Sequence, residues 1–246
     1  ARQWRSLLAG MSGGFERLLI TLDEHYDRTL GTRQMECRTT GHEALNHILH
    51  DRPLSFKNQG QETGSEWELV NSLGVIRWAV PDFAFTHALD LYWDSYPVLL
   101  RTVAGPSRAS IWVELPQQHI VFVGDTVVPQ APPFLAAADL PDWLHALEYL
   151  LSPVFKDYAI VSGRGGIITA NDVKEQKKFL ARVNQVVEKL SGKENDPREI
   201  ERSCLQLLKN FDSGSYRYTQ YLPRLVFGLT QYLKHHLPAG ASRNER

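Results

Sequence analysis

Three short apolar runs end in glycine or charged side chains, and this feature limits the possible fold more than any other in the sequence. Residues 18–22 (LLITL) lead into DEHYDR, residues 119–124 (HIVFVG) lead into Asp125, and residues 158–163 (YAIVSG) lead into Arg164. Each run has the length and composition of a buried strand. Because a rigid sheet positions the loops that follow its strands, ligand sites are common at such junctions. We therefore expect a candidate site at these three strand ends.

Up to about residue 165 the sequence alternates short strands with helices. The predicted strands are 15–22, 34–39, 83–93, 97–105, 109–116, 119–124 and 158–163. The predicted helices are 2–10, 42–51 and 139–154, and a polar, glycine-containing loop is expected at 53–65. Asp139 is the expected N-cap of the third helix, with Pro141 in its first turn. The strands 15–22, 119–124 and 158–163 are expected to be central strands.

After residue 170 the sequence becomes helical. Apolar residues recur at helical spacing from Val173 to Leu190, and Asp196 with Pro197 begins a second helix. A third helix is expected to be interrupted near Pro223. We therefore predict a core at 1–170, C-terminal helices at 171–237 that pack on the same domain, and a disordered tail at 238–246.

Composition and charge exclude several classes of protein. The chain has 246 residues with 43% hydrophobic and 22% charged residues, as in ordinary globular proteins. A net charge of -1 gives no argument for nucleic acid or an anionic membrane as a partner, and neither is expected. No apolar run approaches the roughly 18 residues of a membrane span. The two cysteines, Cys37 and Cys204, do not form a disulfide framework, so a cytoplasmic location is expected.

The order and spacing of the motifs resemble the metallo-β-lactamase superfamily. DEHYDR at 23–28 stands where that family has a His-x-His-x-Asp-His motif. Residues 104–128, AGPSRASIWVELPQQHIVFVGDTVV, resemble its Gly-His turn, hairpin and Gly-Asp motif, and DYAIVSGRGG at 157–166 resembles its last motif, Gly-His-Gly. The likeness covers about residues 1–235. It implies an α/β (α+β) fold, a metallo-β-lactamase-like αββα sandwich, with a helical C-terminal region.

The likeness fails at most of the family's metal ligands. Four histidine positions hold other residue types, which are Asp23, Arg28, Pro106 and Arg164 in chain order. Three ligand positions match the family, which are His25, Asp27 and Asp125. These substitutions weaken both of the metal sites that the resemblance implies.

The first metal would rest on Asp23, His25 and Pro106, and proline offers no side-chain ligand. The second would rest on Asp27, Arg28, Asp125 and Arg164, and arginine stays protonated. A zinc site normally needs three or four protein ligands, so neither site is complete. No cofactor is therefore expected. If zinc or another divalent metal does bind, its expected ligands are His25, Asp27 and Asp125.

The two arginines at the lost histidine positions suggest which charges take the place of the metal. Buried carboxylates such as Asp27 and Asp125 cost several kcal/mol unless they are protonated or find cations. Arg28 and Arg164 carry planar, permanent charges that can bond a carboxylate through two contacts. We expect the old active-site pocket to hold an arginine–carboxylate cluster, formed by Asp23, His25, Asp27, Arg28, Asp125 and Arg164. A small molecule or anion could bind there if one arginine stays partly free.

The N-terminus also departs from the resemblance. Family members have strands before the first helix, and this sequence begins at that helix. Either the chain is a fragment, or another chain covers the exposed sheet edge in an oligomer.

These observations leave three alternative hypotheses for the function. The first is a non-catalytic member of the superfamily with a degraded metal site and a binding or structural role. The alternative is a hydrolase of an ester, thioester or phosphodiester, in which Asp23, His25 and either Asp27 or Asp125 hold one metal. The third is a decayed copy without function, which the well-formed apolar pattern through residue 235 disfavours.

Overall fold

The computed structural model describes residues 1–15, 17–52, 63–70, 76–92, 95–191, 196–211, 214 and 217–236. The predicted tail at 238–246 lies outside these ranges, as do residues 53–62 of the predicted loop. None of the described helices is both long and apolar enough to cross a membrane.

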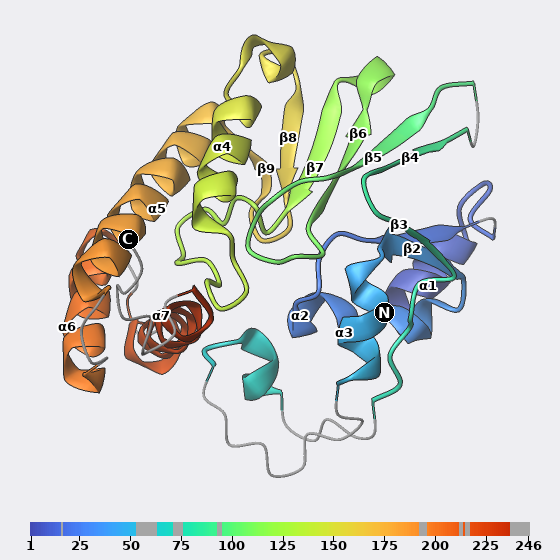
Figure 1. Ribbon diagram of the computed structural model, residues 1–246. Helices are drawn as coiled ribbons and strands as arrows, with labels where there is room; N and C mark the ends of the chain where they lie inside the picture. Colours follow the sequence, from blue (N-terminus) through green and yellow to red (C-terminus); the bar gives the residue numbers. More distant parts are fainter. Residues whose placement is uncertain are drawn as a thin grey trace, which may run out of the picture.

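Two sheets form the centre of the molecule (Figure 1). The smaller sheet has three parallel strands in the order β1 (Leu18–Thr21), β2 (Arg38–His42) and β3 (Phe83–Phe85). The larger sheet has six strands in sequence order: β4 (Ala88–Leu91), β5 (Val98–Thr102), β6 (Ile111–Leu115), β7 (Ile120–Gly124), β8 (Ala159–Ser162) and β9 (Gly166–Ile168). Its strands pair antiparallel except β7 and β8, which run parallel with Ile120 opposite Ala159.

Helices cover the outer faces of both sheets (Figure 1). On the side of the smaller sheet lie α1 (Arg2–Ala9), α2 (Tyr26–Thr29) and α3 (Ala44–His50). On the side of the larger sheet lie α4 (Leu140–Leu150), α5 (Ala170–Leu190), α6 (Pro197–Leu207) and α7 (Leu222–His236). Short 3₁₀ helices lie at Thr32–Met35, Glu66–Leu69, Pro116–Gln118, Pro153–Phe155 and Leu208–Asn210, and a π-helical turn at Arg217–Tyr221 precedes α7. The result is the expected sandwich of two sheets between layers of helices.

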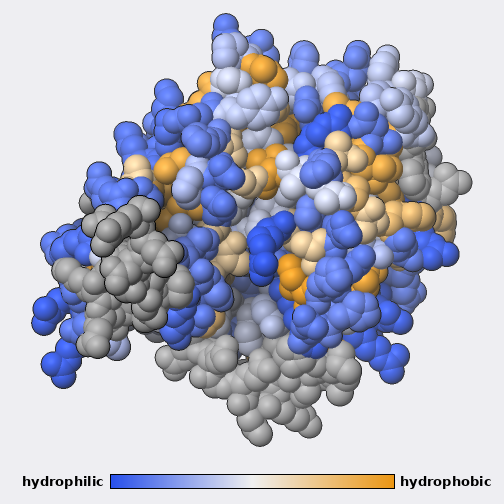
Figure 2. Space-filling view, viewed as in Figure 1, coloured by the Kyte–Doolittle hydropathy of each residue, from blue (hydrophilic) through white to orange (hydrophobic). Residues whose placement is uncertain are grey.

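Three apolar clusters hold these layers together. The largest joins Val121 of β7 to Trp143 of α4, Leu180 of α5 and Leu225 of α7. A second lies between the sheets, and a third lies beneath α3. The face drawn in Figure 2 is largely hydrophilic, with apolar side chains in several separate groups.

Local sequence signals explain how several helices begin. The Asp139 carboxylate accepts a hydrogen bond from the backbone N–H of Asp142, and Asp196 does the same for Arg198, so both predicted N-caps are confirmed. Thr169 and Asp172 form a reciprocal capping box at the start of α5. The π-helical turn ends just before Pro223, near the predicted interruption.

Three strand predictions need correction. The run 83–93 is not one strand: β3 pairs with β2, whereas β4 pairs with β5 in the other sheet. The strand predicted at 34–39 begins only at Arg38, because residues up to Met35 form a 3₁₀ helix and Glu36 has a left-handed φ of 51°.

The third correction concerns β1, which was expected in a central position with β7 and β8. It is instead the edge strand of the smaller sheet among the described strands, while β7 and β8 are interior strands of the larger sheet. The reason is that only β2 pairs with it. Its carboxyl end nevertheless approaches the larger sheet, because Leu22 accepts a hydrogen bond from the N–H of Ile111.

Candidate functional site

The candidate site lies where the ends of β1, β7 and β8 meet. The N–H of Gly163, after β8, donates to the carbonyl of Gly124 at the end of β7 at 2.8 Å. Gly163 also leaves room for the charges around it, because a Cβ there would lie 2.7 Å from Asp125 Oδ1. The strand ends therefore place the side chains that follow them next to one another.

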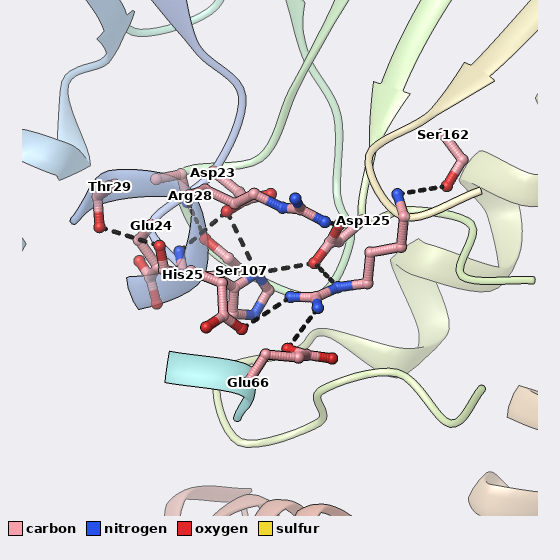
Figure 3. A network of polar contacts seen from close by, with 12 residues as sticks. Asp23, Glu24, His25, Arg28, Thr29, Glu66, Ser107, Asp125 and Ser162 are labelled. Carbon is pink, nitrogen blue, oxygen red and sulfur yellow. Dashed lines mark hydrogen bonds and ion pairs between the residues drawn. The ribbon is translucent and has the colours of Figure 1, made fainter. Parts of the chain in front are cut away.

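Asp125 is the centre of the site and is 2% exposed. Arg28 Nη2 donates to its Oδ1 at 2.9 Å, and Arg164 Nε donates to its Oδ2 at 2.6 Å (Figure 3). Arg28 and Asp125 are separated by 97 positions in the sequence, so the tertiary fold alone brings them together. Both oxygens of this buried carboxylate are bound by guanidinium groups.

Arg164 connects three carboxylates. Besides Asp125, its Nη2 lies 3.2 Å from Asp27 Oδ2, and its Nη1 lies 2.6 Å from Glu66 Oε2. Its side chain is 11% exposed, and its guanidinium carbon lies 5.0 Å from the ring centre of Phe134. Burial disfavours the charged guanidinium, but the neighbouring carboxylates outweigh burial and raise the pKa of Arg164.

Two residues of the site were missed from the sequence. Glu66 Oε1 accepts a hydrogen bond from Arg224 Nη2 at 2.8 Å, so Glu66 bridges Arg164 and Arg224. Arg224, on α7, is 1% exposed and also donates to the carbonyls of Gly64 and Pro132. Glu66 follows a run that looked like an ordinary loop. The arginine inside the apolar run LPRLVFGL was a usable signal, because a charge buried in a helix needs partners.

His25 faces two carboxylates on the other side of Asp125. Its Nδ1 lies 3.2 Å from Asp23 Oδ1 and 3.6 Å from Asp125 Oδ2, and its backbone N–H donates to Asp23 Oδ1 at 2.9 Å. Burial would lower the pKa of His25, but these carboxylates outweigh it and raise the pKa. Burial would raise the pKa of Asp23, but the charge and hydrogen bonds of His25 lower it.

All six site residues expected from the sequence therefore lie in one group, which Glu66 and Arg224 extend. We call these eight residues the Asp125 cluster; its members are Asp23, His25, Asp27, Arg28, Glu66, Asp125, Arg164 and Arg224. Four carboxylates meet three guanidinium groups and one histidine whose pKa is raised. The charges balance when His25 is protonated.

Solved structures share this architecture at low sequence identity. The metallo-β-lactamase from Pontibacter korlensis is 18% identical and has a TM-score of 0.51 over 72% of this chain and 75% of that one. A metallo-β-lactamase family protein from Thermus thermophilus is 14% identical, with a TM-score of 0.56 over 89% of this chain and 74% of that one. This chain has the metallo-β-lactamase fold.

A third structure extends the comparison. A double mutant of the sec-alkyl sulfatase PisA1 is 12% identical, with a TM-score of 0.60 over 89% of this chain and 41% of that one. No family model matches the sequence, and no curated protein matches it. The likeness therefore concerns the metallo-β-lactamase fold and not a particular reaction.

Whether a metal ion can bind at this site depends on which side-chain ligand atoms are free to coordinate it. Asp23, His25 and Asp125 offer ligand atoms that all lie within 4.8 Å of one another. Donors around a tetrahedral zinc ion are separated by about 3.4 Å, so the spacing alone is suitable. However, Arg28 and Arg164 already occupy both oxygens of Asp125, and their charges would repel a cation. The donor set does not fit a metal ion while the arginines hold these positions.

The position of Asp27 differs from the ligand set expected from the sequence. We expected His25, Asp27 and Asp125 as ligands, but Asp23 takes the place of Asp27 in the group with suitable spacing. Asp27 Oδ1 accepts a hydrogen bond from the N–H of Trp67, and Oδ2 faces Arg164. Asp27 lies in the first turn of the short helix α2, and its carboxylate contacts Trp67 and Arg164.

The side chains of Asp27 and Glu66 interact, and this interaction shifts their pKa values in opposite directions. Burial, a hydrogen bond to Glu66 and the charge of Glu66 raise the pKa of Asp27 from 3.8 to about 6, against the opposing charge of Arg164. Burial would also raise the pKa of Glu66, but the hydrogen bond from Asp27 and the charges of Arg224 and Arg164 outweigh it and lower that pKa. Of these two carboxyl groups, Asp27 is therefore the one that is protonated first, as the pH falls through about 6.

The raised pKa of Asp27 predicts a pH-dependent stability. Because the pKa of Asp27 is raised on folding, its contribution to stability is fully present below about pH 4 and is lost as the pH rises through about 6. We expect the free energy of unfolding to fall between about pH 4 and pH 6, and to fall less in Asp27→Asn, which has no proton to lose. Urea unfolding of both proteins at each pH measures this. Identical pH profiles for the two proteins would contradict it.

Proposed function

We propose that this protein is a non-catalytic member of the metallo-β-lactamase superfamily, in which an arginine–carboxylate cluster replaces the metal centre. Its role is binding or structural. The observation that carries the proposal is the occupation of both oxygens of Asp125 by Arg28 and Arg164. Each oxygen of Asp125 keeps a second lone pair, but the two guanidinium charges beside it oppose a metal ion there, which argues against hydrolysis by metal-activated water.

The connections of the cluster support a structural role. Arg28 and Asp27 belong to α2, Asp125 follows β7, Arg164 follows β8, Glu66 belongs to a 3₁₀ helix, and Arg224 belongs to α7. Ion pairs between these residues tie the ends of both sheets to the C-terminal helix. Buried, mutually satisfied charges of this kind hold loops in one arrangement, because breaking one pair leaves another charge unpaired.

Arg28 supports a binding role. Its side chain is 30% exposed, whereas that of Arg164 is 11% exposed. A cavity of 160 Å³ lies beside it, lined by Leu19, Leu22, Thr32 and Gly163 among others. A small anion would enter this cavity and pair with the exposed part of Arg28.

A second candidate function is favoured by one observation, the suitable spacing of Asp23, His25 and Asp125. With Arg164 displaced, these residues would supply three ligands to a single metal, as in a hydrolase of an ester, thioester or phosphodiester. The ion pairs of Arg164 oppose this displacement.

Elemental analysis distinguishes the two functions. We expect protein purified from zinc-, manganese- and iron-supplemented medium to hold less than about 0.2 metal ions per chain, because no complete ligand set is free. His25→Ala should not change this content. The matched control is His235→Ala, which removes an exposed histidine near the end of α7. One tightly bound ion per chain that His25→Ala releases and His235→Ala retains would establish the hydrolase instead.

A further inference from the structure

Glu66 binds two buried guanidinium groups through a side chain that is itself half exposed. Its Oε2 accepts a hydrogen bond from Arg164 Nη1 at 2.6 Å (Figure 3), and its Oε1 accepts one from Arg224 Nη2 at 2.8 Å. The side chain of Glu66 is 45% exposed, whereas those of Arg164 and Arg224 are 11% and 1% exposed. Glu66 is therefore the member of this group that solvent reaches.

Arg164 keeps its position without help from Glu66. Its Nε donates to Asp125 at 2.6 Å and its Nη2 donates to Asp27 at 3.2 Å, so Nη1 is the nitrogen that it directs to Glu66. Its guanidinium carbon also lies 5.0 Å from the ring centre of Phe134. An anion that replaced the Glu66 carboxylate would find Nη1 already in place.

Arg224 is held by backbone carbonyls in a similar way. Its Nε donates to the carbonyl of Gly64 at 3.1 Å and its Nη1 donates to that of Pro132 at 3.1 Å, and its guanidinium carbon lies 4.3 Å from the ring centre of Phe134. These contacts remain if the Glu66 side chain turns toward solvent, but the ion pair is lost. A buried cation in that state needs an anion from elsewhere.

The backbone around Glu66 can stay in place during such a rotation. The N–H of Trp67 donates to Asp27 Oδ1 at 2.8 Å, and the carbonyl of Gly64 accepts from Arg224, so both neighbours of Glu66 have contacts of their own. This backbone lies against the arginines and keeps a second polypeptide chain from approaching as closely. A small molecule needs only the space that the Glu66 carboxylate leaves.

The surrounding charges limit the ligand to one negative charge. Asp27 is hydrogen-bonded to Glu66, and its charge also acts on Arg224. A dianion at the position of the Glu66 carboxylate would add a charge beside Asp27 and Asp125. A carboxylate adds none and offers two oxygens to the two guanidinium groups, as Glu66 does.

We propose that this position binds the carboxylate of a small-molecule ligand, and that the Glu66 side chain is an internal competitor which the ligand replaces. One oxygen of the ligand accepts from Arg164 Nη1 and the other from Arg224 Nη2, while Glu66 turns toward solvent. This inference gives a ligand class to the binding role, and it rests on the proposed function because a metal ion at Asp125 would displace Arg164.

Titration with propionate tests the site on the full chain. Propionate carries its carboxylate on the same short stem as a glutamate side chain. The Nε–H signals of Arg164 and Arg224 in isotope-labelled protein, followed by NMR at pH 7 and constant ionic strength, give its dissociation constant. We expect saturable shifts of both signals in the natural chain and about tenfold tighter binding by Glu66→Gln, because the ligand then no longer competes with a charge-assisted pair.

Three controls identify the cause. Glu175→Gln removes an exposed glutamate that pairs with Lys178 on α5, and it should bind propionate like the natural chain. Arg224→Lys, added to Glu66→Gln, keeps the charge without the planar fork and should lose most of the gain in affinity. Propionamide, which has no charge, should shift neither signal.

The outcomes separate this inference from the proposed function. Absence of a saturable shift in the natural chain, equal affinities of the natural chain and Glu66→Gln, or equal binding of propionamide would overturn the inference while leaving a metal-free structural cluster. Tighter binding of inorganic phosphate, or of a short acidic peptide, than of propionate would overturn the assignment to a small carboxylate. Only a bound metal ion in the elemental analysis overturns the proposed function itself.

Discussion

Replacing Arg164 by alanine is expected to lower the free energy of unfolding by about 3–5 kcal/mol. Arg164 is the partner of Asp125, Asp27 and Glu66, and Asp125 is almost completely buried. Removal of the guanidinium takes one cation from all three carboxylates and leaves Arg28 as the arginine that pairs with Asp125. An uncompensated buried charge costs more than the lost pair itself contributed, which is why the expected effect is large. Urea unfolding at pH 7 measures it.

Two further variants test the cause of this loss. Arg33→Ala removes an exposed arginine and should change the free energy of unfolding by less than about 0.5 kcal/mol. Arg164→Lys keeps the charge, but a compact ammonium cannot reach three carboxylates at once, so its loss should be intermediate. If Arg164→Ala costs no more than Arg33→Ala, the cluster does not hold the strand ends together.

The position of the candidate site could be predicted because the ends of buried strands are recognisable in the sequence. The apolar runs before Asp23, Asp125 and Arg164 are unambiguous, and the resemblance placed them at one edge of a known architecture. Chemical complementarity then predicted that arginines would pair with the remaining carboxylates. The structure contains these pairs between Arg28 and Asp125 and between Arg164 and both Asp27 and Asp125.

Glu66 and Arg224 could not be found in this way. They meet across 158 positions of sequence, and neither stands in a motif. Their contact depends on how α7 packs against the loop before the 3₁₀ helix Glu66–Leu69, and such tertiary contacts leave no local pattern. The position of β1 was wrong for a related reason, since a short apolar run shows that a strand is buried but not which strands flank it.

The reverse substitution, from arginine to histidine, is expected to restore metal binding. Arg28→His, Pro106→His and Arg164→His combined would place imidazoles at three of the four histidine positions that this sequence has lost relative to the metallo-β-lactamase pattern. With Asp23, His25, Asp27 and Asp125 kept, each of the two sites would have at least three donors. The variant also removes the two guanidinium groups that occupy Asp125.

Zinc should then become a stabilising ligand. Without metal the triple variant is expected to be less stable than the natural chain, because its carboxylates have lost their cations. A ligand present at about a thousand times its dissociation constant stabilises the folded state by about 4 kcal/mol. We therefore expect added zinc to raise the free energy of unfolding of the triple variant by about this amount and to leave the natural chain unchanged.

A second triple variant separates metal binding from the loss of arginine. Arg28→Gln, Pro106→Ala and Arg164→Gln remove the same guanidinium groups and supply no imidazole, so this protein should be destabilised equally and should not respond to zinc. A zinc response of the natural chain equal to that of the histidine variant would show that Arg28 and Arg164 do not exclude metal. A response confined to the histidine variant would mean that arginine and metal are alternative partners of Asp125, as the proposed function requires.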